Sequence, residues 1–247
     1  MLGFKLGAGL VGALAMLITQ GIPPGTALPV MLGTTLNAKK DKPGQKIAAR
    51  LMQDIPLPAG EKVKAGAHVT GHIVSVTKIA GGGSRMVLKF DQLQTGGKTI
   101  PLVVSARAIA AMDSVYAAEL PINADSNYVS SNEWVMRQVG GEVVNRAHGV
   151  VASSDSIVGR WDGAPWGKLT TAVEGNCTAT DGNGIVQALW VFSTSACGLY
   201  GFKDVKLVRD GRGEPLGEIV LEFSKDAHIG SGSGWFLLVG GTAAAGQ

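Results

Sequence analysis

The sequence predicts a mostly β protein made of two antiparallel, barrel-like or sandwich-like halves joined by a connector with a short helix. Three observations support this fold class. The 247 residues include 36 glycines, which supply turns of positive φ. Short runs rich in Val, Ile and Leu lie between the glycine turns. Within several runs, apolar and polar residues alternate with a period of two, as they do in half-buried antiparallel strands.

The composition is that of a chain able to form a hydrophobic core. Hydrophobic residues make up 45% of the sequence and charged residues 17%, and the formal net charge is +3. A chain this apolar is not disordered, and its small net charge does not suit the basic surface of a nucleic-acid-binding protein. We therefore expect no nucleic-acid partner.

Residues 1–20 have the pattern of a secretory signal peptide. Lys5 gives a basic start, Leu6–Ile18 form an uncharged apolar run, and Ala13–Ala15 offer a small-x-small cleavage pattern, with cleavage near Gln20 as an alternative. The run is shorter than the roughly 20 residues of a membrane-spanning helix. The pattern predicts export to the periplasm, the outer membrane or the exterior, with no integral membrane span after removal. A buried first element or an uncleaved anchor is the alternative interpretation.

Residues 22–107 are expected to form a small β-barrel or sandwich. Pro and Gly turns separate its apolar runs, and residues 86, 88 and 90 are apolar where 85, 89 and 91 are charged. This alternation is typical of a strand with one buried face. Strands are predicted at residues 26–36, 47–54, 67–76, 85–91 and 99–107.

Residues 108–137 are expected to be a connector with one short helix. They contain small, helix-tolerant residues, and Ser130–Glu133 resemble a capping box. Residues 138–242 then form a second β-rich domain. Strands are predicted there at residues 186–192, 205–208, 219–223 and 235–239, with a glycine-rich turn at Gly230–Gly234 before the last strand.

The two cysteines, Cys177 and Cys197, are expected to form a disulfide in the second domain. An even pair in an exported chain indicates a bridge. The bridge closes a loop of about 20 residues and is worth about 3 kcal/mol in the chain-entropy model. Two buried free thiols are the alternative.

The histidines raise the question of a metal site. His68 and His72 are four residues apart in a segment whose β-branched residues favour a strand. On a strand, that spacing is roughly 13 Å, too far for two ligands of one metal. We therefore expect two exposed strand histidines, with no metal or other cofactor, and equally isolated His148 and His228.

No catalytic residue is predicted. The sequence has no Gly-x-Ser-x-Gly elbow, and its acidic residues in the second half (Asp155, Asp162, Glu174 and Asp210) are too scattered to assign an acid and a base. Trp190 and Trp235 lie in apolar runs and are expected in the core. Trp161 and Trp166 lie in a polar Gly/Pro loop, which makes them the candidate ligand contacts.

Part of the first half resembles the small β-barrel of the TrbI-type subunit of type IV secretion and conjugation channels. The resemblance is carried by Pro23–Val30 (PPGTALPV), Lys42–Leu51 (KPGQKIAARL) and Val63–Ile73 (VKAGAHVTGHI). It covers about a third of the chain and implies a small barrel that belongs to an envelope-spanning complex.

A second resemblance covers most of the chain. Val139–Val144 (VGGEVV), Trp190–Phe202 (WVFSTSACGLYGF) and Pro215–Leu221 (PLGEIVL) are similar to segments of exported, β-rich acidobacterial proteins. This resemblance implies export and a β-rich fold, and it assigns no catalytic residue.

The sequence thus predicts an exported, non-catalytic structural or binding protein of the cell envelope or the exterior. The alternatives are a secreted carbohydrate-binding or carbohydrate-active protein, which has a polysaccharide partner, and an accessory subunit of a type IV secretion-like envelope complex. If the apolar segments 28–31 or 235–239 form sheet edges, the protein is expected to assemble with a second copy or an envelope partner by strand pairing. If these segments are interior strands, their apolar side chains are core.

Overall fold

The computed structural model describes residues 21–119, 138–140, 142–144, 150–153, 156–161, 166–169, 189–193, 196–208, 217–224 and 227–240. For 142–144, 150–153, 156–161 and 166–169 the description covers the backbone. The predicted signal peptide, at residues 1–20, lies outside the described residues.

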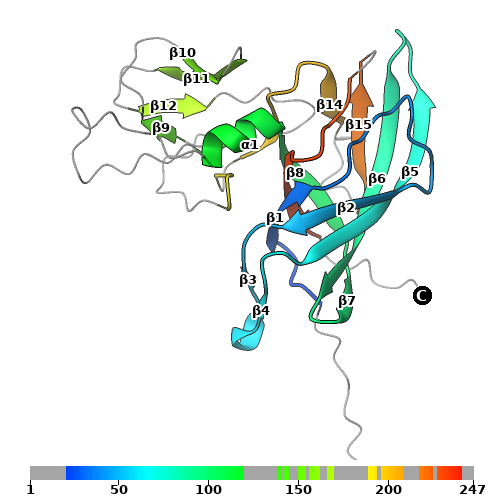
Figure 1. Ribbon diagram of the computed structural model, residues 1–247, viewed down its shortest axis with the longest axis vertical. Coiled ribbons are helices and arrows are strands. Elements are labelled where there is room, and N and C mark those ends of the chain that lie inside the picture. The colour runs from blue at the N-terminus through cyan, green and yellow to red at the C-terminus, as the bar shows by residue number, and fades with distance from the viewer. Residues whose placement is uncertain are drawn as a thin grey trace, which may run out of the picture.

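The chain is mostly β, as predicted, and is dominated by a ten-stranded, nearly closed, barrel-like sheet (Figure 1). Its strand order is β13-β8-β16-β1-β2-β5-β6-β15-β14, and β7 also pairs with β6. The strands are β1 (Ala27–Leu32), β2 (Lys46–Leu51), β5 (His68–Lys78), β6 (Ser84–Thr95), β7 (Lys98–Pro101), β8 (Val104–Ala110), β13 (Gly198–Tyr200), β14 (Val205–Val208), β15 (Ile219–Phe223) and β16 (Gly234–Val239). The strands at the two ends of the order, β13 and β14, are consecutive in the chain and are joined by residues 201–204.

Smaller elements complete the description. A hairpin is formed by β3 (Ile55–Pro56) and β4 (Lys62–Val63), with the 3-10 turn η1 (Pro58–Gly60) between them. The helix α1 (Met112–Glu119) lies in the predicted connector. A second, four-stranded sheet has the order β10-β11-β12-β9; its strands are β9 (Glu142–Val144), β10 (Val150–Ser153), β11 (Ser156–Trp161) and β12 (Trp166–Leu169).

The large sheet joins strands from both sides of the connector. The last strand, β16, pairs with β8 on one side and with β1 on the other. Segments 28–31 and 235–239 are therefore interior strands, and their apolar side chains are core rather than exposed sheet edges. Of the two alternatives that the sequence leaves open, the interior one holds, so neither segment offers a free sheet edge for pairing.

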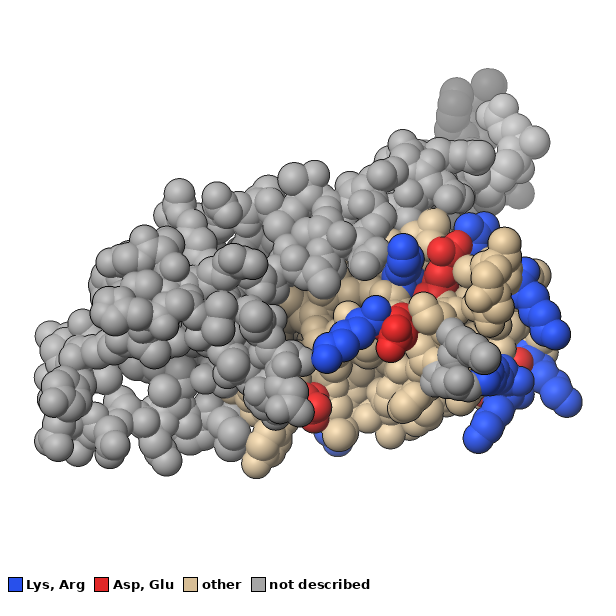
Figure 2. All heavy atoms as spheres, turned by 90° about the horizontal axis from the view of Figure 1, so that it is seen from above, with Lys and Arg blue, Asp and Glu red and all other residues tan. Residues whose placement is uncertain are grey.

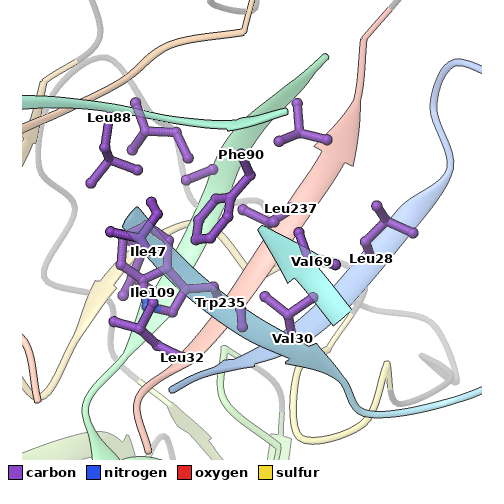
Figure 3. Close-up of a cluster of buried hydrophobic side chains, with 14 of the residues drawn as sticks. Leu28, Val30, Leu32, Ile47, Val69, Leu88, Phe90, Ile109, Trp235 and Leu237 are labelled. Atoms are coloured by element: carbon purple, nitrogen blue, oxygen red, sulfur yellow. The ribbon is translucent and has the colours of Figure 1, made fainter. Parts of the chain in front are cut away.

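The barrel interior is filled by the apolar half of each alternating strand. Met86, Leu88 and Phe90 of β6 are at most 1% exposed, and Val87 and Lys89 between them face outward. Phe90 meets Trp235 edge to face, with ring centroids 5.8 Å apart (Figure 3). Trp235 is fully buried, as predicted, and its indole N–H donates to Ser233 Oγ at 3.1 Å. That bond satisfies the one polar group of this side chain, which would otherwise be buried at a cost.

β8 is buried on both faces because it lies between two cores. One face contributes to the barrel interior, and Ala108 and Ala110 on the other face join a second cluster with Val115 of α1 and Phe236. Small side chains allow the close approach of this second layer. The connector was expected to begin at residue 108, and burial here instead keeps residues 108–110 in the strand, overriding the helix tolerance of alanine.

Trp190 differs from its expected place in a core strand. Residues 189–192 form a turn in which Leu189 and Phe192 bond to each other, and Trp190 is half-buried with a φ of 57°. A bulky residue seldom adopts this conformation. It is held here by two bonds, from its backbone N–H to Gln53 Oε1 at 2.6 Å and from its indole N–H to Glu119 Oε1 at 2.9 Å.

Candidate binding surface

The outward side chains of β2, β5 and β6 form a polar surface, which we call the outer face. Strand pairing places Arg50 opposite His68 and His68 opposite Gln94, and it places Lys46 opposite His72 and His72 opposite Lys89. Side chains that are directly opposite on neighbouring strands lie about 5 Å apart at Cβ. The outer face comprises Lys46, Ala48, Arg50, His68, Thr70, His72, Lys89, Asp91, Gln92 and Gln94.

A β-bulge shapes the middle of the outer face. Thr70 pairs with Gln92 and Gly71 pairs with Phe90, so Asp91 is the extra residue on β6. Asp91 consequently lies beside Gln92 on the outside of the sheet, where a regular strand would turn one of them inward. The Asp91 backbone carbonyl accepts a bond from the Leu102 N–H at 2.8 Å. The bulge therefore adds a carboxylate to a row of imidazole, amide and amine groups.

One end of the outer face carries polar and charged side chains that contact acidic groups. His72 Nδ1 lies 3.0 Å from Asp91 Oδ2, and Lys89 Nζ lies 3.2 Å from Glu218 Oε1. Beyond this end, Arg85 donates to Glu222 Oε1 through both Nε and Nη2, at 3.1 and 2.7 Å. Figure 2 shows acidic and basic side chains side by side over the barrel. Such exposed pairs add little stability, but they leave little net charge for a ligand.

The rest of the outer face carries polar side chains that are exposed and available. Arg50, His68, Gln92 and Gln94 lie toward the other end, and Lys46 lies opposite the engaged His72. We call Lys46, Arg50, His68, Gln92 and Gln94 the open end; all five residues are exposed. Within the described part of the chain, no hydrogen bond or ion pair engages their side chains. This end can therefore donate to and accept from a ligand without first breaking a bond within the protein.

The structure confirms that His68 and His72 lie on a strand. Both point outward from β5, where their neighbours differ: His72 contacts Asp91, and His68 belongs to the open end. Among the described residues, no group of three or more His, Cys, Asp or Glu side chains could hold a metal ion. His228 is exposed, and His148 lies outside the described residues.

The two candidate ligand contacts of the second sheet are placed by their backbone. Trp161 is the last residue of β11 and pairs with Gly167, and Trp166 is the first residue of the neighbouring β12. The scattered acidic residues Asp155, Asp162, Glu174 and Asp210 all lie outside the described residues.

Cys197 is buried directly before β13. Its backbone N–H donates to Tyr200 Oη at 3.0 Å. Cys177 lies outside the described residues, so the bridge between the two cysteines stays a prediction.

Two titratable groups serve the framework rather than the outer face. The Asp54 carboxylate accepts a hydrogen bond from the Ala65 backbone N–H and contacts the Lys62 ammonium, which ties the β3–β4 hairpin to the next turn. These two contacts, the first more than the second, hold the pKa of the Asp54 carboxyl well below its usual range. Burial raises the pKa of Tyr200 to about 12, against smaller opposing effects of the Cys197 N–H and the Arg107 charge.

Within the described residues, no helix has the length and apolarity needed to span a bilayer. Comparison of the sequence and structure with family models, curated proteins and solved structures found no match.

The individual residues of the open end were visible in the sequence, but the surface they form was not. In the sequence, His68 raises only the question of a metal ligand, and nothing places Arg50, Gln92 and Gln94 next to one another. The alternation in residues 46–51 and 68–73 was the available signal that these side chains point outward.

Proposed function

We propose that this protein is exported and acts, without catalysing a reaction, as a binding or structural protein of the cell envelope or the exterior. The observation that carries the proposal is the open end of the outer face. Polar side chains there are fixed in register by three paired strands and are not engaged with one another. Side chains on a packed sheet are held more firmly than those on loops, which suits them to recognition.

Export and binding support each other in this proposal. The pattern of residues 1–20 supports passage across a membrane, and an oxidising compartment favours a Cys177–Cys197 disulfide. That disulfide anchors the start of β13, the strand that ends the sheet order. A barrel secured in this way is a rigid platform for a surface that binds an extended partner.

Cell fractionation and envelope binding test the proposal. The native protein should be recovered from the envelope or the medium and should lack residues 1 to about 15–20, as mass spectrometry would show. The purified mature protein should sediment with isolated cell envelopes. An intact Met1 terminus in the cytoplasm, together with no sedimentation, would contradict the proposal. Co-purification of secretion-channel subunits would instead support an accessory role in a type IV secretion-like complex.

A carbohydrate-active role is the second candidate, and one observation favours it. Trp161 and Trp166 lie at the adjoining ends of two paired strands. Tryptophan is a large amphipathic residue of the kind that sugar-binding surfaces use. Release of reducing sugars from envelope polysaccharide, lost in Trp161→Ala and Trp166→Ala, would support the enzyme. Retained polysaccharide binding without turnover would support the binding protein.

A further inference from the structure

We propose that the open end of the outer face binds an acidic polysaccharide. This inference rests on the proposed function and specifies its partner. It uses Lys46 and Arg50 for charge and His68, Gln92 and Gln94 for hydrogen bonds.

Charge complementarity favours an acidic partner. Lys46 and Arg50 are both exposed on β2 and have no acidic partner among the described residues. The acidic groups nearest in the sheet are already engaged, Asp91 by His72 and Glu218 by Lys89. Counting Lys46, Arg50 and Lys89 against Asp91 and Glu218, the side chains on and beside the outer face carry an excess of one positive charge.

The spacing of the two cations favours a ligand with sparse charge. Lys46 and Arg50 are four residues apart on one strand, roughly 13 Å. Ala48 lies between them in a neutral row that continues through Thr70 and Gln92. Duplex DNA carries a charge every ~1.7 Å along its axis, which is far denser than this surface. A polysaccharide whose carboxylates lie at least one sugar ring apart matches the spacing better.

The neutral side chains suit a ligand rich in hydroxyl groups. Gln92 and Gln94 each offer an amide donor and acceptor, and Thr70 offers a hydroxyl. Arg50 has a guanidinium that can bind a carboxylate with two parallel bonds. The outward positions of the open end contain no aromatic ring on which a nucleic-acid base could stack. These groups are those that recognise an acidic sugar chain rather than a nucleic acid.

Binding of labelled hyaluronan and alginate fragments, followed by fluorescence anisotropy, tests the inference. The mature protein should bind both, more weakly as salt is raised, and should not bind neutral dextran. Lys46→Gln with Arg50→Gln should weaken binding about tenfold, as expected for two charge-assisted contacts. Lys203→Gln with Lys206→Gln removes the same charge from exposed positions at and before β14 and should change binding little.

A second pair of variants separates hydrogen bonding from net charge. Gln92→Ala with Gln94→Ala should weaken hyaluronan binding while leaving its salt dependence as it is. All variants change exposed side chains, so unchanged thermal midpoints should accompany them. Equal losses in the Lys46/Arg50 and Lys203/Lys206 variants would overturn the inference, as would tighter binding of single-stranded DNA than of either polysaccharide.

Sedimentation with cell envelopes, measured in parallel, distinguishes the two proposals. Sedimentation without binding of either acidic polysaccharide overturns the inference and keeps the proposed function. If the protein neither sediments with envelopes nor binds either acidic polysaccharide, the proposed function and this inference are both overturned. If the Lys46/Arg50 variant no longer sediments with envelopes and the Lys203/Lys206 variant still does, the result supports the proposed function and this inference.

Discussion

Replacement of Gly71 by alanine is expected to be one of the most damaging single substitutions in the barrel. A Cβ at this position would lie 1.8 Å from the Lys89 carbonyl oxygen and 2.8 Å from the Phe90 Cα, both backbone atoms of β6. To reach a separation of 3.0 Å, β6 would have to move by more than an ångström. Paired strands are only about 4.8 Å apart, so such a shift breaks the local ladder bonds.

The cost can be estimated from what the shift disturbs. Two ladder bonds at about 1 kcal/mol each are weakened, and Phe90, which is 1% exposed and packs on Trp235, loses contacts. We expect a loss of about 3–5 kcal/mol, at the upper end of single-substitution effects. Because the strain also displaces the bulge, His72 and Asp91 should separate as well.

Urea denaturation followed by tryptophan fluorescence measures this effect. Gly230→Ala is the matched control, because a Cβ there would meet nothing within 4 Å and Gly230 has no positive φ. The control should unfold at the midpoint of the unmodified protein. A Gly71→Ala midpoint that coincides with that of Gly230→Ala would refute the close approach of β5 and β6.

Three further predictions concern the framework. Tyr200→Phe should cost about 1–3 kcal/mol at neutral pH, because the buried Cys197 N–H loses its acceptor. The folded state raises the pKa of Tyr200 from about 10 to about 12. The free energy of unfolding of the unmodified protein should therefore be unchanged below pH ~10 and fall by about 2–3 kcal/mol as the pH rises to ~12. A fall of equal size in Tyr200→Phe would contradict this. Asp54→Asn should speed amide exchange at Ala65 without moving the global unfolding midpoint. The difference should be full above the ordinary Asp pKa. It should shrink as the pH falls from there toward the much lower pKa that Asp54 has in the folded state; an effect that is unchanged in strong acid would contradict this. Thiol labelling of the denatured, unreduced protein should find no free Cys177 or Cys197, and replacing both by Ser should cost about 2–4 kcal/mol; full labelling before reduction would exclude the bridge.

Much of the strand pattern could be predicted because it depends on local alternation. The segment predicted at 219–223 coincides with β15, and the one predicted at 235–239 differs from β16 by a single residue. In β15 the sequence alternates, and its residues 219, 221 and 223 are buried. β16 is apolar throughout, so its sequence indicates a strand without indicating which side is buried.

Strand order could not be predicted because it depends on pairing between distant segments. Residue 235 pairs with residue 30, across most of the chain. The segments around these two residues are apolar throughout, so their sequences do not distinguish an edge strand from an interior one. The bulge at Asp91 was equally hidden, since an extra residue in a strand leaves no compositional mark. The turn at Trp190 was missed because tertiary bonds to Gln53 and Glu119 hold a conformation that tryptophan rarely adopts.

The central claim, that the open end is where the protein meets its partner, is tested most directly by lysine acetylation footprinting on isolated cell envelopes. Mass spectrometry would compare the acetylation rate of each lysine in the free and the envelope-bound protein. We predict that Lys46 is protected on binding, while Lys203 and Lys206, exposed at and before the far strand β14, react equally in both states. Protection of Lys203 and Lys206 with Lys46 still reactive would contradict the account and place the binding surface elsewhere.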